Sequence, residues 1–275
     1  MTLHDRGPHA CSLLAVFAHP DDESIACGGL LASCADAGVE VSVCCATGGE
    51  LGSTAGMPAS PAPRPADVRR ARVEELRNAA RILGVTTVVV LDYEDGMLPW
   101  IDAERLEADI RDTIVRLRPD VVVTFGDDGL YGHPDHIAIH ERTTAAVAGL
   151  GVNAPALYYV TMPAGHMSAV VRHVTAACAD RGTPGDAPDR ILGVADAGAF
   201  GALAAPPTLV IDVGRFAARK LAAIKCHRTQ LEGDALSMIA ESDAARLLGT
   251  EQFHRGGVGS QTAAFVEQFA SPDRF

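Results

Sequence analysis

Short apolar runs alternate along this chain with longer segments in which apolar residues recur at helical spacing. The apolar runs cover residues 12–18, 39–46, 86–92, 120–125, 157–161 and 208–213. The helical patterns cover residues 24–37, 67–83, 103–117, 134–146 and 215–231. Apolar runs of this length predict buried strands, and their alternation with helices predicts a mainly parallel sheet covered on both faces. We therefore expect a Rossmann-like, three-layer α/β/α fold.

The connections of such a fold predict which strands are neighbours. In a doubly wound sheet of order 3-2-1-4-5, the strands at residues 12–18 and 120–125 lie side by side, and the chain reverses direction between them. Ligands bind in the crevice beyond the carboxyl ends of the strands at this switch point. Side chains that directly follow these two strands are therefore expected to meet.

Length and charge indicate one domain and argue against several kinds of partner. With 275 residues, 48% of them hydrophobic, the chain fits a single domain over residues 1–275, with a flexible tail at residues 1–11. The net charge is -12, and Lys220 and Lys225 are the only lysines. Phosphate binding needs clustered basic residues, so we expect no nucleic-acid partner. No apolar run approaches the ~20 residues of a membrane-spanning helix, so no membrane insertion is expected.

The cysteines bear on the cellular compartment. There are seven, an odd number, and no two of them form a Cys-x-x-Cys pair. Most lie in apolar runs, as reduced core thiols do. The apolar run that begins at Cys11 is too short for a secretory signal. The pattern predicts a cytoplasmic protein.

The first candidate for chemistry is the polar stretch His19-Pro20-Asp21-Asp22-Glu23, which follows the apolar run at residues 12–18. Acidic side chains are favourable beside the positive end of a helix dipole, so this stretch could serve only to begin a helix. However, one carboxylate is sufficient for capping, and here two adjacent aspartates follow a histidine. Imidazole and carboxylate are ligands of zinc and of other first-row metals.

A second stretch has the same order of features. After the apolar run at residues 120–125 comes Tyr131-Gly132-His133-Pro134-Asp135-His136, followed by a helical pattern. Strand, His-Pro-Asp and helix therefore occur twice. Since the two strands are expected to be neighbours, the two stretches should lie at the same edge of the sheet.

Counting ligands gives a hypothesis for the chemistry. A catalytic zinc has three protein ligands and an open position for water. His19 and Asp22, spaced i, i+3, can share one face of a turn, and His136 supplies a third ligand. Asp21 is then placed to act as general base. His133 can stabilise an oxyanion or protonate a leaving amine, and Asp135 can fix the protonation state of His133.

Other interpretations remain open for single residues. His19 can be a histidine that only occupies a helix start, and Asp22 can be only a helix cap. His136 and His140 are spaced i, i+4 and can form a metal-binding pair without His19. Iron(II) fits the same ligands as zinc.

The two stretches resemble the LmbE/PIG-L family of zinc-dependent N-deacetylases, which remove acetyl groups from N-acetylglucosamine units. The resemblance is clear over residues 12–150 and loose beyond them. It implies the following roles: zinc binding by His19, Asp22 and His136, general base catalysis by Asp21, stabilisation of the transition state by His133, and contact with the developing oxyanion by Tyr131, a mobile tyrosine in the family.

Weaker similarities imply residues that bind the substrate. The loop from Thr47 to Gly52 resembles a family loop that places Glu50 near the sugar. The resemblance also assigns Arg72 to a sugar hydroxyl or phosphate group, and Asp95 to sugar hydroxyls. A C-terminal helix of the family contains a histidine that matches His227, and the family's C-terminal part shapes substrate choice, which here corresponds to the poorly matching residues 180–207.

We conclude that the sequence predicts an enzyme that hydrolyses an amide and removes acetyl from a small molecule containing N-acetylglucosamine. One alternative is a thiol S-conjugate amidase of the same family, which cleaves a larger acyl group. Another is a nucleotide-binding Rossmann module without hydrolytic activity, although no Gly-x-Gly-x-x-Gly follows the first strand. A homo-oligomer is compatible with either enzyme.

Overall fold

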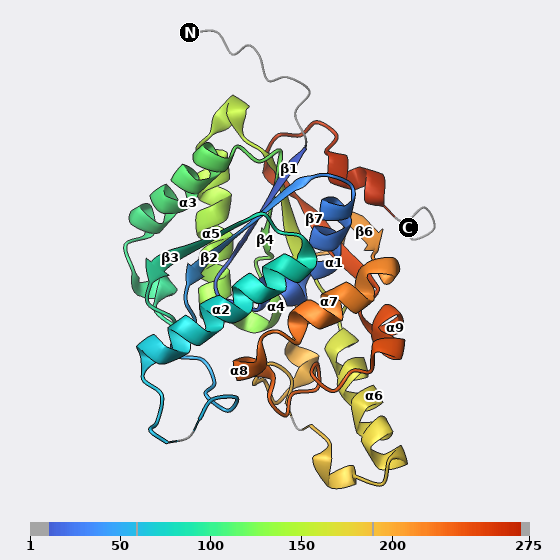
Figure 1. Cartoon of the computed structure of the whole chain (residues 1–275). Helices are drawn as coiled ribbons and strands as arrows, with labels where there is room; N and C mark the ends of the chain where they lie inside the picture. Colours follow the sequence, from blue (N-terminus) through green and yellow to red (C-terminus); the bar gives the residue numbers. More distant parts are fainter. Residues whose placement is uncertain (1–10, 59, 189, 271–275) are drawn as a thin grey trace.

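The computed structural model describes residues 11–58, 60–188 and 190–270. The predicted tail at residues 1–11 lies outside these ranges, except for Cys11. Within them, the central sheet has seven strands in the order β3-β2-β1-β4-β5-β7-β6 (Figure 1). The strands are β1 (Ser12–Phe17), β2 (Glu40–Thr47), β3 (Thr87–Tyr93), β4 (Val121–Phe125), β5 (Ala156–Thr161), β6 (Leu209–Asp212) and β7 (Thr250–Gly259).

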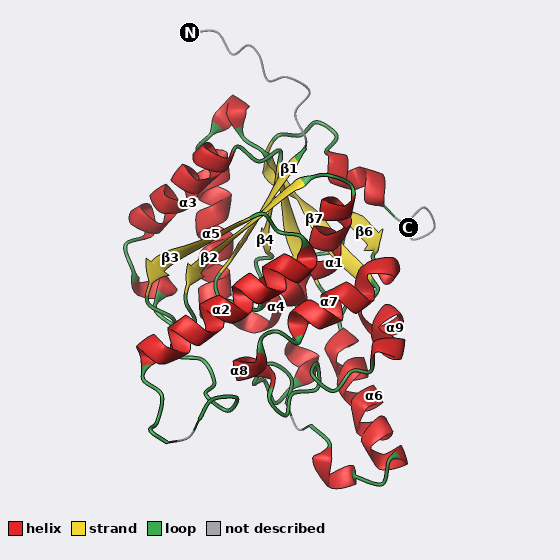
Figure 2. Ribbon diagram, viewed as in Figure 1, coloured by secondary structure: helices red, strands yellow, loops and turns green. Residues whose placement is uncertain are grey.

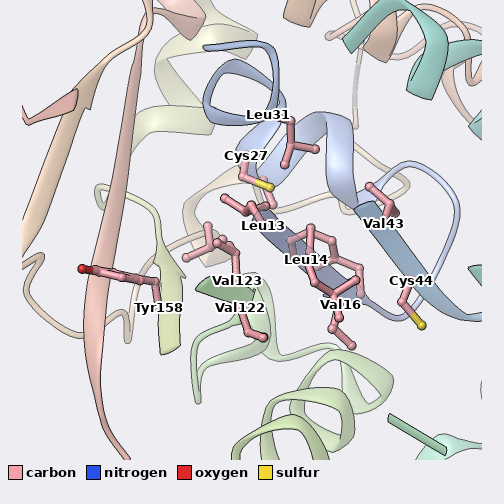
Figure 3. Close-up of a cluster of buried hydrophobic side chains, with 14 of the residues drawn as sticks. Leu13, Leu14, Val16, Cys27, Leu31, Val43, Cys44, Val122, Val123 and Tyr158 are labelled. Atoms are coloured by element: carbon pink, nitrogen blue, oxygen red, sulfur yellow. The ribbon is translucent and has the colours of Figure 1, made fainter. Parts of the chain in front are cut away.

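The first five strands confirm the predicted order and direction. They are mutually parallel, and β1 lies between β2 and β4, with Leu13 opposite Val41 on one side and Val121 on the other. Strand β1 is buried on both faces, as expected for the centre of a parallel sheet. Figure 3 shows side chains of β1, β2 and β4 packed with Cys27 and Leu31 of the first helix.

Helices cover both faces of the sheet, which confirms the three layers (Figure 2). Helices α1, α2 and α7 pack together on one face, and α3 and α5 pack together on the other. Their bounds are α1 (Asp22–Asp36), α2 (Pro65–Leu83), α3 (Ala103–Leu117), α5 (Pro134–Ala148) and α7 (Ala217–Ile224). The predicted bounds of α1, α2, α3 and α5 are correct within two residues, and Gly84 ends α2 in the left-handed conformation.

Helix α1 contains a break that a distant carboxylate stabilises. Cys27 has non-helical angles (φ -146°, ψ 21°). The backbone N–H groups of Gly29 and Leu30 donate to the Glu251 carboxylate at 2.8 and 2.7 Å. Lys220 of α7 donates to the same carboxylate at 2.7 Å. A buried charge pair on this face therefore satisfies N–H groups at the break, since unpaired buried donors are costly.

The C-terminal part differs most from the prediction. Strand β7 was not predicted, and it joins β6 to the sheet through antiparallel pairing with both β5 and β6. The predicted helix over residues 215–231 is wrong in its continuity, because it is divided into α7 and the short α8 (Arg228–Leu231). The remaining helices are α4 (Gly129–Gly132), α6 (His166–Asp180) and α9 (Ala244–Leu248), of which α6 and α9 help to build a second apolar cluster.

The described residues also bear on the cysteines and on membranes. All seven cysteines are free thiols, and five of them are buried, as predicted. Among the described residues, no helix has both the length and the apolarity that crossing a bilayer requires.

Candidate metal and substrate site

The two histidine-containing stretches meet where β1 and β4 end. His19 and Asp22 follow β1, and His136 lies in the first turn of α5, after β4. All three side chains are buried. Nδ1 of His19 lies 3.3 Å from Nε2 of His136, and the two oxygens of Asp22 lie 3.3 Å from that Nε2 and 3.5 Å from that Nδ1. The predicted convergence of the two segments is confirmed.

These distances fit a metal-binding group. Ligand atoms at about 2.0–2.1 Å from a tetrahedral zinc lie about 3.3 Å apart. The ring of His133 also faces this group, and nitrogens of His19, His133 and His136 lie within 4.8 Å of one another. The structure therefore contains a candidate His/Asp metal site. Two groups of possible ligands occur among the described residues: His19 with His133 and His136, and His19 with Asp95 and Asp135. The alternative pair of His136 and His140 gains no support, because His140 belongs to neither group and contacts the carbonyl oxygen of Phe125 at 2.9 Å.

The ring of His136 is oriented by its surroundings. Its Nδ1 lies 3.1 Å from the carbonyl oxygen of Gly129, and its ring stacks on Phe125 with centroids 3.9 Å apart. Burial lowers the pKa of His136 to about 3. A neutral imidazole whose Nδ1–H is held by a carbonyl presents the Nε2 lone pair to the cluster, as a metal ligand must.

The far side of His19 contacts two more carboxylates. Its Nε2 lies 3.1 Å from Asp95 and 3.2 Å from Asp135. Burial opposes the charged form, but hydrogen bonds to Asp135, Asp22 and Asp95 outweigh it and raise the pKa of His19 well above its usual range. Histidine ligands commonly donate their second N–H to a carboxylate, which fixes the ring.

The expected role of Asp135 toward His133 is not what the structure shows. The Asp135 carboxylate contacts His19 and accepts the N–H groups of Gly96 and Leu98 at 2.8 and 3.2 Å. Its backbone N–H, not its carboxylate, donates to Nδ1 of His133 at 3.2 Å. The carboxylate is drawn away because two backbone donors and an imidazole together satisfy it.

The neighbouring aspartates have different environments. Burial acts against the charge of Asp22, but His136 and His19 lower the pKa of Asp22 well below its usual value. Asp21 points elsewhere, 3.1 Å from the guanidinium of Arg72. Burial raises the pKa of Asp21 to about 6 although Arg72 acts in the opposite direction. The two carboxylates therefore differ in their surroundings: the histidines favour the ionised form of Asp22, whereas burial favours the protonated form of Asp21.

The cluster lies in a cavity of about 600 Å³. Eight of the predicted site residues line it: His19, Asp21, Asp22, Arg72, Asp95, Tyr131, His133 and His136. Its other walls come from residues to which the sequence analysis gave no individual role, although some lie in the loop from Thr47 to Gly52 or in residues 180–207. They are Ile25, Leu51, Gly52, Ser53, Gly96, Leu130, Arg190, Leu192, Gly193, Gln230, Glu232, Gly233 and Asp234. Several of these follow no periodic pattern in the sequence, so no local signal marks them.

Two predicted substrate residues do not line this cavity. Glu50 accepts the backbone N–H of Asp95 at 3.0 Å and faces a neighbouring hollow together with Arg69. His227 has 0% of its surface exposed and contacts Glu23 at 3.0 Å. Both residues lie outside the cavity lining, because the backbone N–H of Asp95 holds Glu50 and the carboxylate of Glu23 holds His227.

Tyr131 is held by a segment from far along the chain. It lies in the irregular helix α4, where Leu130 has a positive φ of 65°. Its ring packs against Phe200, with centroids 4.6 Å apart, and also lies 5.4 Å from the ring of His136. The N–H of Gly201 donates to the carbonyl of Leu130 at 2.8 Å. Residues 200–201 therefore fix the place of the tyrosine beside the cluster.

Comparison with known proteins agrees with these features. The family model described as PIG-L: GlcNAc-PI de-N-acetylase matches residues 14–147, which include both stretches. The chain is 35% identical over 245 residues to the 1D-myo-inositol 2-acetamido-2-deoxy-alpha-D-glucopyranoside deacetylase of Nakamurella multipartita, covering 80% of each protein. The chain belongs to the PIG-L family. The resemblance of the two motifs to this family is thereby confirmed.

Solved structures share the fold of this PIG-L protein. The N,N'-diacetylchitobiose deacetylase of Pyrococcus horikoshii superposes with a TM-score of 0.62 at 22% identity, over 90% of this chain and 84% of that one. The 4-carboxy-2-hydroxymuconate hydratase GalB of Pseudomonas putida gives 0.60 at 20% identity, over 92% and 100%. Since one fold serves a deacetylase and a hydratase, the reaction must be argued from the site.

Proposed function

We propose that this protein is a metal-dependent deacetylase that removes the acetyl group from a glucosaminyl-inositol with a 2-acetamido group. The observation that carries the proposal is the meeting of His19, Asp22 and His136 in the lining of one cavity, which Asp21 also lines. The name of the relative from Nakamurella multipartita supplies the substrate.

Zinc is the metal that the donor set fits best. His19, Asp22 and His136 would hold it, because two imidazoles and a carboxylate at this spacing leave one position open. Iron(II) accepts the same donors. When bound, the metal polarises the amide carbonyl and makes water more acidic.

Asp21 is the group that takes the proton from the attacking water. Its pKa of about 6 suits a general base that works near neutral pH. Arg72 holds the carboxylate in place through the contact at 3.1 Å. The division between Asp21 as base and Asp22 as ligand follows from their different neighbours.

His133 and Tyr131 line the same cavity and lie next to the rings of the cluster. Because Nδ1 of His133 accepts the backbone N–H of Asp135, the proton of the neutral ring lies on Nε2. Burial lowers the pKa of His133, which makes its charged form a ready proton donor to the leaving amine. The hydroxyl of Tyr131, whose pKa burial raises, stays protonated and can donate to the developing oxyanion.

The charges around the cavity favour a neutral aglycone. Acidic lining residues outnumber basic ones: Asp21, Asp22, Asp95, Glu232 and Asp234 against Arg72 and Arg190. Arg72 is bound to Asp21 and to two backbone carbonyls. A divalent ion held by Asp22 would offset part of this negative charge. The carboxylates of Asp95, Glu232 and Asp234 would still accept hydrogen bonds from inositol hydroxyls, whereas Arg72 is already engaged and offers little to a phosphate. We therefore favour glucosaminyl-inositol over a phosphatidylinositol-linked substrate.

The test is an amine-release screen with purified protein. The substrates are N-acetylglucosaminyl-inositol, its phosphatidylinositol-linked counterpart, N-acetylglucosamine and an N-acetylated thiol S-conjugate. We expect fastest release from the first, about one equivalent of divalent metal per chain, and loss of activity with a chelator that added zinc restores. Preferred cleavage of the S-conjugate would instead favour the amidase, and a metal-free protein that binds nucleotide would favour the Rossmann module.

A further inference from the structure

The backbone of Asp21 has a conformation that residues with side chains seldom adopt. Its φ is 127° and its ψ is -30°. Non-glycine residues with such positive φ are strained and persist only where their surroundings hold them. The strain is therefore a reason to examine which groups hold Asp21.

Asp21 occupies the N-cap position of α1 but does not act as a cap. An N-cap aspartate normally accepts a backbone N–H from the first turn of its own helix. The Asp21 side chain makes no such bond, and its carboxylate contacts Arg72 and lines the cavity. The strained backbone thus releases the carboxylate from the helix and leaves it beside Arg72 in the lining of the cavity.

Glu23 holds the backbone of Asp21 in this position. Its Oε2 accepts the N–H of Asp21 at 3.1 Å. Its other oxygen accepts the hydroxyl of Ser24 and contacts Nε2 of His227 at 3.0 Å. Glu23 and His227 both have 0% exposure. A buried carboxylate persists when it is paired and hydrogen-bonded, so His227 stabilises the group that holds Asp21.

The chain next to His227 is anchored to α2. His227 lies at the break between α7 and α8. Two residues later, the backbone N–H and the hydroxyl of Thr229 donate to Glu75 of α2 at 3.0 and 2.7 Å, where Figure 1 shows α8 beside α2. Arg72, which contacts Asp21, lies one helical turn before Glu75. These contacts and the two short chain segments between them connect both sides of Asp21, through Glu23 and through Arg72.

We propose that Glu23 and His227 are positioning residues that impose the strained conformation of Asp21 and thereby aim its carboxylate into the cavity. Neither residue lines the cavity, so neither touches substrate. The inference rests on the proposed role of Asp21 as general base. The proposal also gives a function to the break between α7 and α8, because His227 lies at this break. An unbroken helix over residues 215–231 would place His227 within a helix instead.

The experiment compares Glu23→Gln, Glu23→Ala and His227→Gln with the natural protein. We expect kcat to fall at least tenfold in Glu23→Ala and His227→Gln, with KM and metal content unchanged. Glu23→Gln should retain more activity, because its amide oxygen still accepts the N–H of Asp21. In an Asp21→Asn background, Glu23→Gln should cause no further loss of kcat, since it acts only through Asp21. Additive losses would indicate general destabilisation and overturn the proposal.

Glu251→Gln is the matched control. Glu251 is also a buried carboxylate that accepts backbone N–H groups of α1 and pairs with a buried cation, Lys220. It should lower the thermal midpoint by a similar amount and leave kcat per bound metal unchanged.

A crystal structure of Glu23→Gln or Glu23→Ala gives a readout independent of activity. We expect φ of Asp21 to become negative in Glu23→Ala and to stay positive in Glu23→Gln. An unchanged φ in Glu23→Ala would overturn the proposal. If the natural protein hydrolyses none of the substrates, the proposed function fails, and this structural comparison still decides whether Glu23 holds Asp21. If Glu23→Ala does not fold, His227→Gln takes its place in both measurements.

Discussion

The carboxylate of Asp135 lies 3.2 Å from Nε2 of His19, on the side of the ring opposite to the metal-binding cluster. The same carboxylate accepts two backbone N–H groups, from Gly96 and Leu98. Asp135 is therefore rigidly placed, and it connects the loop after β3 to the histidine after β1. A metal-binding histidine that is oriented in this way loses less entropy when it binds the ion.

This relationship predicts the effect of Asp135→Asn on the metal. The amide cannot provide two acceptor oxygens, so either a backbone donor or His19 loses its partner. Loss of such an outer partner typically lowers metal affinity by about 10–100-fold. Competition with a chromogenic chelator measures the change. Asp102→Asn is the control, because Asp102 also accepts two backbone N–H groups but caps the distant helix α3; a similar loss of affinity in this variant would contradict the prediction.

The two adjacent aspartates should respond differently to replacement. Asp22 contacts both His19 and His136, so Asp22→Ala should lose bound metal and, with it, turnover. Asp21 contacts Arg72, so Asp21→Ala should keep about one metal per chain while kcat falls by about 10²–10⁴-fold, the usual contribution of a general base. Elemental analysis and amine release measure the two quantities on the same samples. The reverse pattern would exchange the roles of the two residues.

The position of the metal-binding cluster could be predicted because it depends on topology and on local motifs. The first five strands are marked by apolar runs, and their order follows from general rules of parallel sheets. His19 and His136 each lie within three residues of a strand end or helix start, so the predicted sheet was sufficient to bring them together. The identity of these ligands rests on two short motifs that both occur in full.

The rest of the site depends on contacts between residues that are distant in the sequence. The pair of Glu23 and His227 spans 204 residues, and no periodicity at either position marks it. Strand β7 contains Gly256, Gly257 and several polar residues, so its β pattern is weak, and only its pairing with β5 and β6 makes it a strand. For the same reason the cavity wall at residues 230–234 could not be found from the sequence, and at residues 190–193 only the wider segment 180–207 was indicated, by resemblance.

Phe200 should affect catalysis through Tyr131. Its ring is fully buried and packs against Tyr131 with centroids 4.6 Å apart. Phe200→Leu should leave space for the tyrosine to move, so that kcat falls several-fold while metal content is unchanged. Phe253→Leu is the control, since Phe253 of β7 is equally buried. Both variants should lose about 1–3 kcal/mol of stability, measured by urea unfolding. Equal losses of kcat in the two variants would show that Phe200 does not affect catalysis through Tyr131.

Asp234 should make the stability of the protein depend on pH. This residue is buried, and its carboxylate connects two loops of the cavity wall through the N–H groups of Leu192 and Leu236. Burial raises the pKa of Asp234 to about 6, above its value of about 4 in an unfolded chain. The folded protein therefore binds the proton of Asp234 more tightly than the unfolded chain does.

The sign of the effect follows from this difference. The stabilising contribution of the protonated carboxyl is complete below about pH 4 and is lost as the pH rises through about 6. A difference of about two pH units corresponds to at most about 3 kcal/mol. Asp234→Asn has no such proton, so the free energy of unfolding of the natural protein, minus that of the variant, should fall between pH 4 and pH 6. Urea unfolding at several pH values measures this difference. A value that stays constant over the range would mean that the two backbone donors hold the carboxylate ionised, and that charge rather than protonation maintains this wall of the cavity.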